Sequence, residues 1–428
     1  MNINFLRSLL QKTTQSPLIK NISTVAVGTG IAQIFPIIFY PLLARIFPPS
    51  EFGLLAIVVS IVPILSVIAS GAFEGAILLS KSKVSSINLA AYILIRSSFI
   101  LMLFLLLIIF FGNQIAILLN EPRLNQWLYV VPVLCIGVIF VNLTNEWFVK
   151  YKYFSRLSLN KALYTITNVL SKVALGLLGS LKTGGLVLGD LAGKMIMMVY
   201  VSLTFLHLDK DQLRHITKSR IFNSTSEVKD FPKFVMPDQI ISNLGGSIHV
   251  FFISAFFGAT ELGYVAIVSS ILYAPITVFS SAIKDVFRQR AKEDFDATGS
   301  CRELYIKLLP PVAGIAFLGF GTLYLIIPPF FNIFLGEQWI KAADYAQIMI
   351  PLFFFSFISM ALKDVFIVVK KMHIALYWQF FFIFLLLLSL IISTYLYDSL
   401  EVTLYFMTVA NSFSYFLYIF LSYYFAKA

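Results

Sequence analysis

Long apolar runs separated by short polar segments follow one another along nearly the whole chain. A helix that crosses a bilayer needs roughly 20 apolar residues, and twelve such stretches can be placed. The first six lie at 20–44, 52–80, 87–111, 126–148, 157–181 and 184–206. The other six lie at 233–257, 261–287, 307–329, 343–369, 373–397 and 402–425. The pattern predicts an all-α polytopic membrane protein with twelve transmembrane helices.

One eleven-residue segment occurs twice. EFGLLAIVVSI at Glu51–Ile61 and ELGYVAIVSSI at Glu261–Ile271 agree at seven positions. Their offset of 210 residues is about half the chain, which indicates two fused copies of one unit. We therefore expect two pseudo-symmetric six-helix bundles, residues 1–207 and 231–428, joined by a polar cytoplasmic linker at 208–230. Two homologous halves also favour a binding site where they face each other.

The composition agrees with this architecture. Hydrophobic residues make up 59% of the chain and charged residues only 12%, against about a quarter charged in soluble proteins. The two cysteines and four histidines show no disulfide or metal-ligand spacing. Gly189–Lys194 resembles a phosphate-binding loop but is one residue too short and lies inside an apolar span. We expect no metal, no cofactor and no ATP hydrolysis.

The basic residues are distributed unequally between the two sides of the membrane. With the N-terminus in the cytoplasm, 25 of the 32 Lys and Arg residues fall on the cytoplasmic side. The opposite side holds Arg45, Arg123, Lys182 and Lys341. The positive-inside rule thus predicts that both termini are cytoplasmic. It also explains the net charge of +11 without a nucleic-acid partner.

Three charged residues fall deep within the fifth and sixth spans. Lys172 and Lys194 lie at matching distances from the turn between these spans, near the membrane midplane. Asp190 precedes Lys194 by four residues, so the two share a helix face. The trio is either a two-lysine cradle for an anionic group or an internal ion pair that joins two helices. Small residues that permit close helix approach accompany it: Gly185, Gly189 and Gly193.

Other ionisable residues within or near the spans each leave two interpretations open. Glu74 and Lys284 occupy equivalent positions under the 210-residue offset. Either they pair to form an inner gate, or Lys284 is only the first residue of a basic surface run. Arg96 lines a cavity or extends to the cytoplasmic surface. Arg45 contacts substrate or anchors the first span at the interface.

The seventh span carries a polar, glycine-rich run flanked by Asp238 and His249. A helix with so much small and polar surface is not expected to face lipid throughout. Asp238 is the best single candidate for a proton or cation site, with His249 beside the same run.

Three segments resemble a known family: Ala44–Ile61, Phe256–Ile271 and Phe334–Leu352. They are similar to the polysaccharide transporters of the multidrug/oligosaccharidyl-lipid/polysaccharide (MOP) flippase superfamily, in particular O-antigen repeat-unit flippases. The resemblance implies a MATE-like fold, a central cavity and alternating access. It implies that an undecaprenyl-pyrophosphate-linked oligosaccharide moves from the cytoplasmic to the periplasmic leaflet of a bacterial inner membrane, in lipopolysaccharide biosynthesis beside polysaccharide polymerase machinery.

The candidate site residues follow from this function. An anionic headgroup would be bound by basic residues chosen from Lys172, Lys194, Arg96, Arg45 and Lys284. Coupling or gating would use Glu74, Asp190, Asp238 and His249. A small-molecule drug or cation antiporter of the same superfamily is an alternative, although it needs a carboxylate-centred site. A glycan polymerase is a further alternative, but it would need a large outer loop, and we expect a transporter rather than an enzyme.

Overall fold

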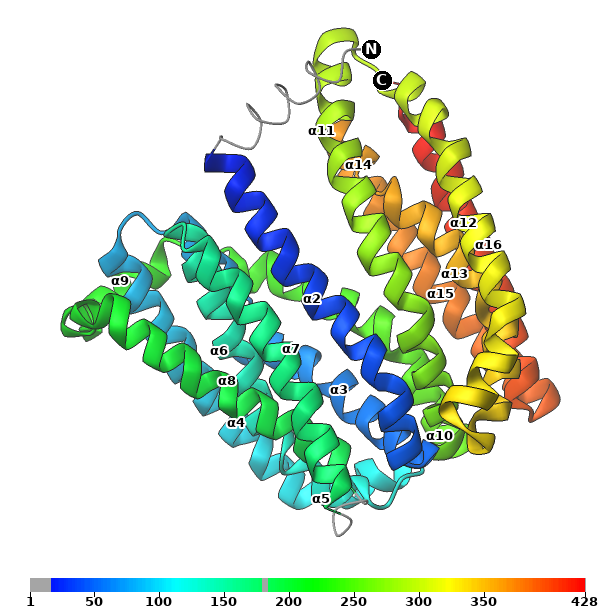
Figure 1. Cartoon of the computed structure of the whole chain (residues 1–428). Helices are drawn as coiled ribbons and strands as arrows, with labels where there is room; N and C mark the ends of the chain where they lie inside the picture. Colours follow the sequence, from blue (N-terminus) through cyan, green and yellow to red (C-terminus); the bar gives the residue numbers. More distant parts are fainter. Residues whose placement is uncertain (1–16, 179–183, 428) are drawn as a thin grey trace. The chain divides into compact units, whose positions relative to one another are not determined.

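The computed structural model describes residues 17–178 and 184–427, apart from the side chains of residues 17–27 and of Ala282 (Figure 1). The α-helices are α2 Pro17–Ile46, α3 Pro49–Ser70, α4 Lys83–Leu118, α5 Leu124–Leu128, α6 Val131–Lys150, α7 Phe154–Leu177, α8 Gly185–Asp209, α9 Lys218–Ser226, α10 Met236–Pro275, α11 Ser281–Thr298, α12 Arg302–Phe330, α13 Ile340–Ala361, α14 Val365–Val368, α15 Met372–Tyr397 and α16 Leu400–Phe425. Short 3-10 helices are η1 Phe73–Leu79, η2 Lys210–His215 and η6 Glu337–Trp339. Short π-helices are η3 Phe231–Val235, η4 Ile276–Ser280 and η5 Phe331–Leu335. Among these residues the extended backbone pairing is one isolated bridge, Ser300–Lys427, so the predicted all-α class is confirmed.

Ten helical segments of the described chain are long and apolar enough to cross a membrane. One of them, Phe231–Thr298, is 68 residues long and contains two of the predicted spans. Its backbone turns sharply at Gly258, where φ is 82° and ψ is 171°. The more polar α7, which corresponds to the predicted span 157–181, is not among the ten. The predicted count of twelve is compatible with these helices, and Lys182 lies outside the described residues.

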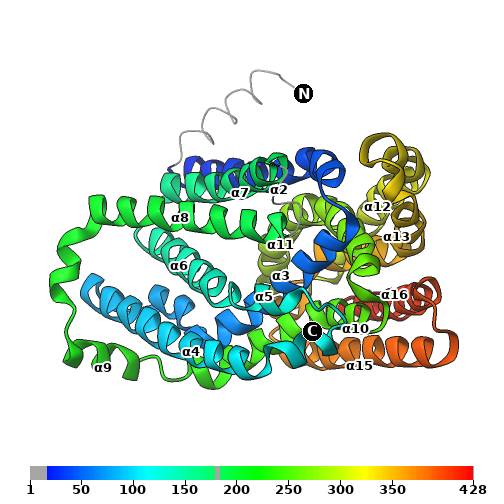
Figure 2. The same ribbon diagram turned by 90° about the horizontal axis from the view of Figure 1, so that it is seen from below.

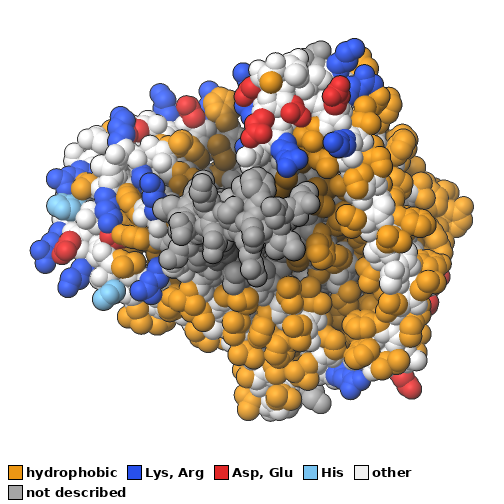
Figure 3. Space-filling view, turned by 45° about the horizontal axis from the view of Figure 1, so that its top comes forward, with side chains coloured by type: hydrophobic (Ala, Val, Ile, Leu, Met, Phe, Trp, Pro, Cys, Tyr) orange, Lys and Arg blue, Asp and Glu red, His pale blue; other side chains and the backbone are white. Residues whose placement is uncertain are grey.

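The surface has the character of a membrane protein. Large apolar side chains on the long helices face outward, among them Phe384, Ile391 and Tyr395 on α15. Figure 3 shows broad hydrophobic areas on one face, with Lys and Arg side chains gathered in separate patches. Apolar surface of this extent is stable only against lipid or a partner, so the chain is a multi-pass membrane protein.

Contacts between residues divide the chain into two compact units. Unit 1 consists of the residues up to Phe39, Val58–Asn113 and Arg123–Ile241. Unit 2 consists of Tyr40–Ile57, Gln114–Pro122 and Ser242–Ala428. These units follow the density of contacts, whereas the predicted halves follow the duplication of the sequence. The halves at 1–207 and 231–428 stay a prediction.

Within unit 1, α7 and α8 pack closely along each other (Figure 2). A side chain at Gly189 would overlap the backbone of Lys172, and one at Gly193 would overlap the backbone of Asn168. The glycine spacing on α8 therefore does what the sequence predicts, because it allows two helix backbones to approach. Helix α6 covers α8, with Gly137 against the alkyl chain of Lys194.

The second predicted span, 52–80, is not one continuous helix. Helix α3 ends at Ser70, and Gly71 and Ala72 both have positive φ (71° and 58°). The 3-10 helix η1 follows, so Glu74 lies after a chain reversal rather than inside a spanning helix. In the second copy of the repeat the chain continues instead through η4 into α11. Left-handed backbone at Gly71 and Ala72 is incompatible with a helix, which hydropathy alone does not detect.

The predicted linker at 208–230 is folded. It contains η2 and α9, and it is held to the start of α4. The Asn88 side chain donates to the carbonyl of His215 at 3.1 Å and accepts from the Thr217 backbone N–H at 3.1 Å. The buried carboxylate of Asp209 accepts from the Trp147 indole at 2.9 Å and contacts the Lys83 ammonium.

Unit 2 is built around α13. This helix packs against both α12 and α16, and α16 packs along α15 (Figures 1 and 2). Most of the side chains along α13 are buried, including Tyr345, Met349 and Phe353. Helix α13 therefore forms the core against which the outer helices of this unit assemble.

The two copies of the repeated segment cross each other within unit 2. A side chain added at Gly53 would overlap the backbone of Ala259, and one added at Gly263 would overlap the backbone of Pro49. Under the 210-residue offset Pro49 corresponds to Ala259, and Gly53 corresponds to Gly263. The two contacts are therefore reciprocal, as in a two-fold symmetric interface. In each copy the glycine therefore leaves room for the backbone of the other copy.

Candidate functional site

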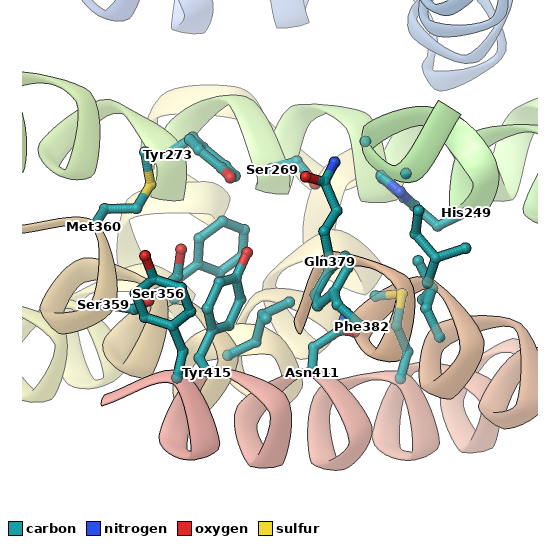
Figure 4. A pocket seen from close by; sticks show the side chains of 18 of the residues that line it. His249, Ser269, Tyr273, Ser356, Ser359, Met360, Gln379, Phe382, Asn411 and Tyr415 are labelled. Carbon is teal, nitrogen blue, oxygen red and sulfur yellow. The ribbon is translucent and has the colours of Figure 1, made fainter. Parts of the chain in front are cut away.

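A cavity of about 490 Å³ lies inside unit 2. Both parts of α10, together with α13, α15 and α16, contribute to its walls (Figure 4). Its volume is within the ~300–1,000 Å³ range of pockets that enclose small ligands. A hollow of this size in a membrane helix bundle is the first candidate for a binding site.

Small residues of α10 make room for the cavity. Gly246 has no atom near the position of a side chain, and a side chain at Gly245 would already touch Ile383. Ser242 and His249 lie on the same stretch of α10 and also line the cavity. The polar, glycine-rich run singled out in the sequence thus faces a cavity rather than packing throughout against lipid. Asp238 lies one turn before this run, in the first turn of α10, and is exposed.

Aromatic side chains form one side of the cavity. The Trp378 ring centroid is 4.6 Å from that of Tyr418 and 5.8 Å from that of Tyr415. Two hydrogen bonds fix these rings, because the Trp378 indole donates to the Ser414 carbonyl at 2.8 Å and the Tyr418 hydroxyl donates to the Lys363 carbonyl at 2.7 Å. Their flat faces are therefore held in place before any ligand arrives.

Neutral polar groups form the rest of the wall. Hydroxyl and amide side chains come from four helices: Ser242, Ser269, Ser356, Ser359, Gln379 and Asn411. Figure 4 shows the Gln379 amide directed across the cavity toward α10, near Ser269. The Oδ1 atom of Asn411 is buried and accepts no hydrogen bond from the described protein atoms. Apart from three tyrosines, the ionisable side chains among the described lining residues are His249 and Lys363, and no carboxylate is among them.

The predicted charged trio in unit 1 comes together in the structure. Asp190 is buried, with 4% of its surface exposed, and contacts three donors. The Lys172 ammonium lies 3.6 Å from Oδ1, the Asn168 amide donates to Oδ1 at 2.7 Å, and the Lys194 ammonium contacts Oδ2. One carboxylate thus serves both lysines and ties α7 to α8. A role for the lysines as an anion cradle stays a prediction.

Arg96 and Glu74 lie near the end of α3. The Arg96 guanidinium donates to the carbonyl of Ile68 at 3.0 Å and also to that of Ala69. It therefore caps the carboxyl end of α3. Glu74 experiences the charges of both Arg96 and Glu146. Substrate contact by Arg96 stays a prediction.

Arg45 and Lys284 lie in unit 2. The Arg45 guanidinium donates to the carbonyls of Phe334 at 2.9 Å and Ile333 at 2.7 Å, at the end of η5. This position fits the anchoring interpretation of Arg45. Lys284 is half-buried on α11. Because Glu74 belongs to unit 1, the predicted gate between Glu74 and Lys284 stays a prediction.

Sequence reasoning missed the walls that α13, α15 and α16 contribute to the cavity. Ser356, Gln379 and Asn411 each interrupt a strongly apolar span. A search for uncharged polar residues in every span would have included them, but together with many other polar residues and without showing that they converge.

The three segments that carry the family resemblance meet at one buried tryptophan. The Trp339 indole donates to the Ala44 carbonyl at 2.8 Å. Its ring packs edge-on against Phe52 at 5.1 Å and against Tyr264 at 5.8 Å. Trp339 is fully buried. These motifs therefore hold unit 2 together, which explains why they are specific for a fold and carry no information about a ligand.

Comparison with solved structures identifies the fold. An inward-facing MATE family multidrug resistance transporter of the MOP superfamily has a TM-score of 0.63 and 14% identity, with 94% of this chain and 92% of that chain covered. A MOP superfamily transporter from Pyrococcus furiosus has a TM-score of 0.63 and 13% identity, with 94% of each chain covered. The lipid II flippase MurJ, in an inward closed conformation, has a TM-score of 0.58 and 15% identity, with 93% of this chain and 81% of that chain covered.

Of the two sequence comparisons, the one with family models identifies the family. No curated protein matches the chain. Residues 42–344 match the family described as "Polysaccharide biosynthesis protein". This range covers most of the chain and contains the first two of the three segments that meet at Trp339, together with residues 334–344 of the third. The chain therefore belongs to the polysaccharide biosynthesis protein family, and its fold is that of the MOP superfamily transporters.

Proposed function

We propose that this protein is a flippase that moves an undecaprenyl-pyrophosphate-linked oligosaccharide from the cytoplasmic to the periplasmic leaflet of a bacterial inner membrane. The observation that carries the proposal is a cavity lined by hydroxyl, amide and aromatic groups inside an apolar helical bundle. Polar groups inside a membrane bundle mark a substrate pathway by default. Membership of a polysaccharide biosynthesis family supports a glycan as the transported group.

Transport requires that the polar headgroup cross the membrane while the polyprenyl tail remains in lipid. The main energetic cost is desolvation of the headgroup, which a polar route through the protein offsets. An anion that leaves a cell with a negative interior gains about 2.3 kcal/mol per charge per 100 mV. No covalent chemistry is needed, so the proposed role is transport rather than catalysis. Similarity in fold to a lipid II flippase supports this role.

We assign the predicted charged residues to this cycle as follows. Basic residues among Lys172, Lys194, Arg96, Arg45 and Lys284 bind the pyrophosphate. Acidic or titratable residues couple or gate the movement, namely Glu74, Asp190, Asp238 and His249. Both termini lie in the cytoplasm, and polymerase machinery receives the glycan on the other side.

The test is translocation by the purified protein in liposomes. The probe is a polyprenyl-pyrophosphate-linked oligosaccharide with a fluorescent sugar, and the measurement is the fraction exposed to a membrane-impermeant quencher. Protein-dependent transfer between leaflets is expected, whereas empty liposomes show none. The proposal fails if no pyrophosphate-linked glycan is moved while the same liposomes export cationic dyes, which would identify a drug antiporter.

A deletion strain separates the proposal from a polymerase. Loss of a flippase leaves lipid-linked repeat units on the cytoplasmic side of the membrane. Loss of a polymerase leaves unpolymerised units outside the cell. Glycosidase digestion of spheroplasts, in which the outer membrane no longer excludes the enzyme, distinguishes the two outcomes, because the enzyme reaches only units beyond the inner membrane.

A further inference from the structure

The cavity of unit 2 combines two kinds of surface that one ligand class matches. The rings of Trp378 and Tyr415 present apolar surface to the cavity, with the buried ring of Tyr418 packed edge-on against Trp378, while Gln379 and Asn411 contribute amide groups. Sugar rings have apolar C–H faces that pack on aromatic rings, and a rim of hydroxyls that donate and accept hydrogen bonds. Binding pockets commonly pair an apolar lining with a few placed polar groups in this way.

Asn411 contributes a buried amide to the wall of the cavity. Its residue surface is 5% exposed, and its Oδ1 atom is buried without a hydrogen-bond donor among the described protein atoms. An unsatisfied buried acceptor is costly, so such groups are paired with water or with a ligand. Because Oδ1 is buried in the wall of the cavity, a ligand hydroxyl reaches this acceptor only when the amide turns toward the cavity.

The charge of the lining argues against other ligand classes. A buried organic cation is commonly paired with a carboxylate, and the described lining residues include no Asp or Glu. A pyrophosphate needs several cations, whereas Lys363 is the lysine that lines the cavity and its residue is exposed. His249 is the one histidine among the described lining residues, so it does not supply the several cations that a pyrophosphate needs. The lining thus fits an uncharged polyhydroxylated ligand better than either ion.

We propose that this cavity binds an uncharged sugar ring of the transported glycan, with the Trp378 and Tyr415 rings against its C–H face and Gln379 and Asn411 on its hydroxyls. The pyrophosphate binds elsewhere in the protein. This inference rests on the proposed function, because it assigns one part of the same substrate to one site.

The test uses the purified full-length protein and the neutral oligosaccharides released by mild acid from the lipid-linked glycans of its own source cells. Binding is followed through tryptophan fluorescence, since Trp378 lies in the cavity wall. We expect saturable binding that inorganic pyrophosphate does not displace. Gln379→Leu and Asn411→Leu should each weaken it at least tenfold. Gln347→Leu is the matched control, because Gln347 lies on α13 beside a separate hollow and should bind as the wild type does.

Any of three results overturns the inference. The oligosaccharide does not bind, pyrophosphate displaces it, or Gln379→Leu and Asn411→Leu bind it as tightly as the control Gln347→Leu. Gln379 is only half-buried, so Gln379→Leu keeps the test valid if Asn411→Leu does not fold. Translocation by the wild type with unaltered binding in the variants would refute this site and leave the flippase intact. Specific sugar binding without translocation would refute the flippase alone.

Discussion

Removing the charge of Asp190 is predicted to lower the stability of unit 1. Asp190 is buried and is contacted by Lys172, Lys194 and Asn168. At an effective dielectric constant of about 20, charges 3.6 Å apart attract by about 5 kcal/mol. Asp190→Asn removes this attraction and leaves the ammonium groups of Lys172 and Lys194 buried without a carboxylate partner. Breaking a buried pair in this way costs about 3–5 kcal/mol, so a large fall in the unfolding temperature is expected.

The chain offers a matched control. Lys292 and Asp296 form an ion pair of the same i,i+4 kind, but both side chains are at least half exposed. Asp296→Asn should cost only about 0.3–0.5 kcal/mol. Thermal unfolding in detergent, followed by tryptophan fluorescence, compares the two variants. If Asp190→Asn unfolds at the same temperature as Asp296→Asn, the reasoning about burial is refuted.

A triple variant separates the two interpretations of the trio. Lys172→Met, Asp190→Leu and Lys194→Met together replace all three charges by apolar groups of similar size, and such replacements are often neutral or stabilising. If the trio only joins α7 to α8, this variant keeps both stability and translocation. If the lysines cradle an anion, the variant stays folded and loses translocation.

Three further changes test other parts of the structure. Gly53→Ala should destabilise unit 2 by about 1–3 kcal/mol through overlap with the Ala259 backbone, whereas Gly314→Ala, where a side chain meets open space, should be neutral or stabilising in the same unfolding assay. Burial raises the pKa of the Cys301 thiol to about 11, so at pH 7.5 the thiolate that reacts is rare; mass spectrometry should find Cys301 unmodified by maleimide until the protein is unfolded. Arg45→Met should lower stability by about 1 kcal/mol, because two carbonyls lose a donor. Arg45 is not among the described lining residues of the cavity, so affinity for the neutral oligosaccharide should be unchanged, whereas a loss of affinity for the pyrophosphate-linked glycan at full stability would place Arg45 among the residues that bind the pyrophosphate.

The sequence predicts the helices well because apolar length is a strong, local signal. It also predicts the close approach of α7 to α8, because glycines four residues apart lie on one helix face and leave room for a neighbouring helix backbone. It does not predict the break after Ser70, because that depends on left-handed backbone at Gly71 and Ala72. Nor does it predict that Arg96 and Arg45 bind backbone carbonyls, which depends on where helix ends meet in three dimensions.

The cavity shows a different limit of sequence reasoning. Its wall on α10 is visible in the sequence as a cluster of small and polar residues. The other walls come from single polar residues on separate helices, such as Ser356 and Asn411. Each alone resembles an ordinary helix residue, and only their convergence in space identifies a site.

The reciprocal crossing of Gly53 and Gly263 bears on the origin of the protein. A contact that is unchanged when its two partners are exchanged is the contact that two identical chains make across a two-fold axis. A half-length ancestor could thus have assembled as a homodimer through this crossing before its gene was duplicated and fused. Fusion then freed each copy to specialise. At the same offset, Gly245, Gly246 and His249 of the cavity wall correspond to Phe35, Pro36 and Phe39, so the second copy has small and polar residues where the first has bulky ones.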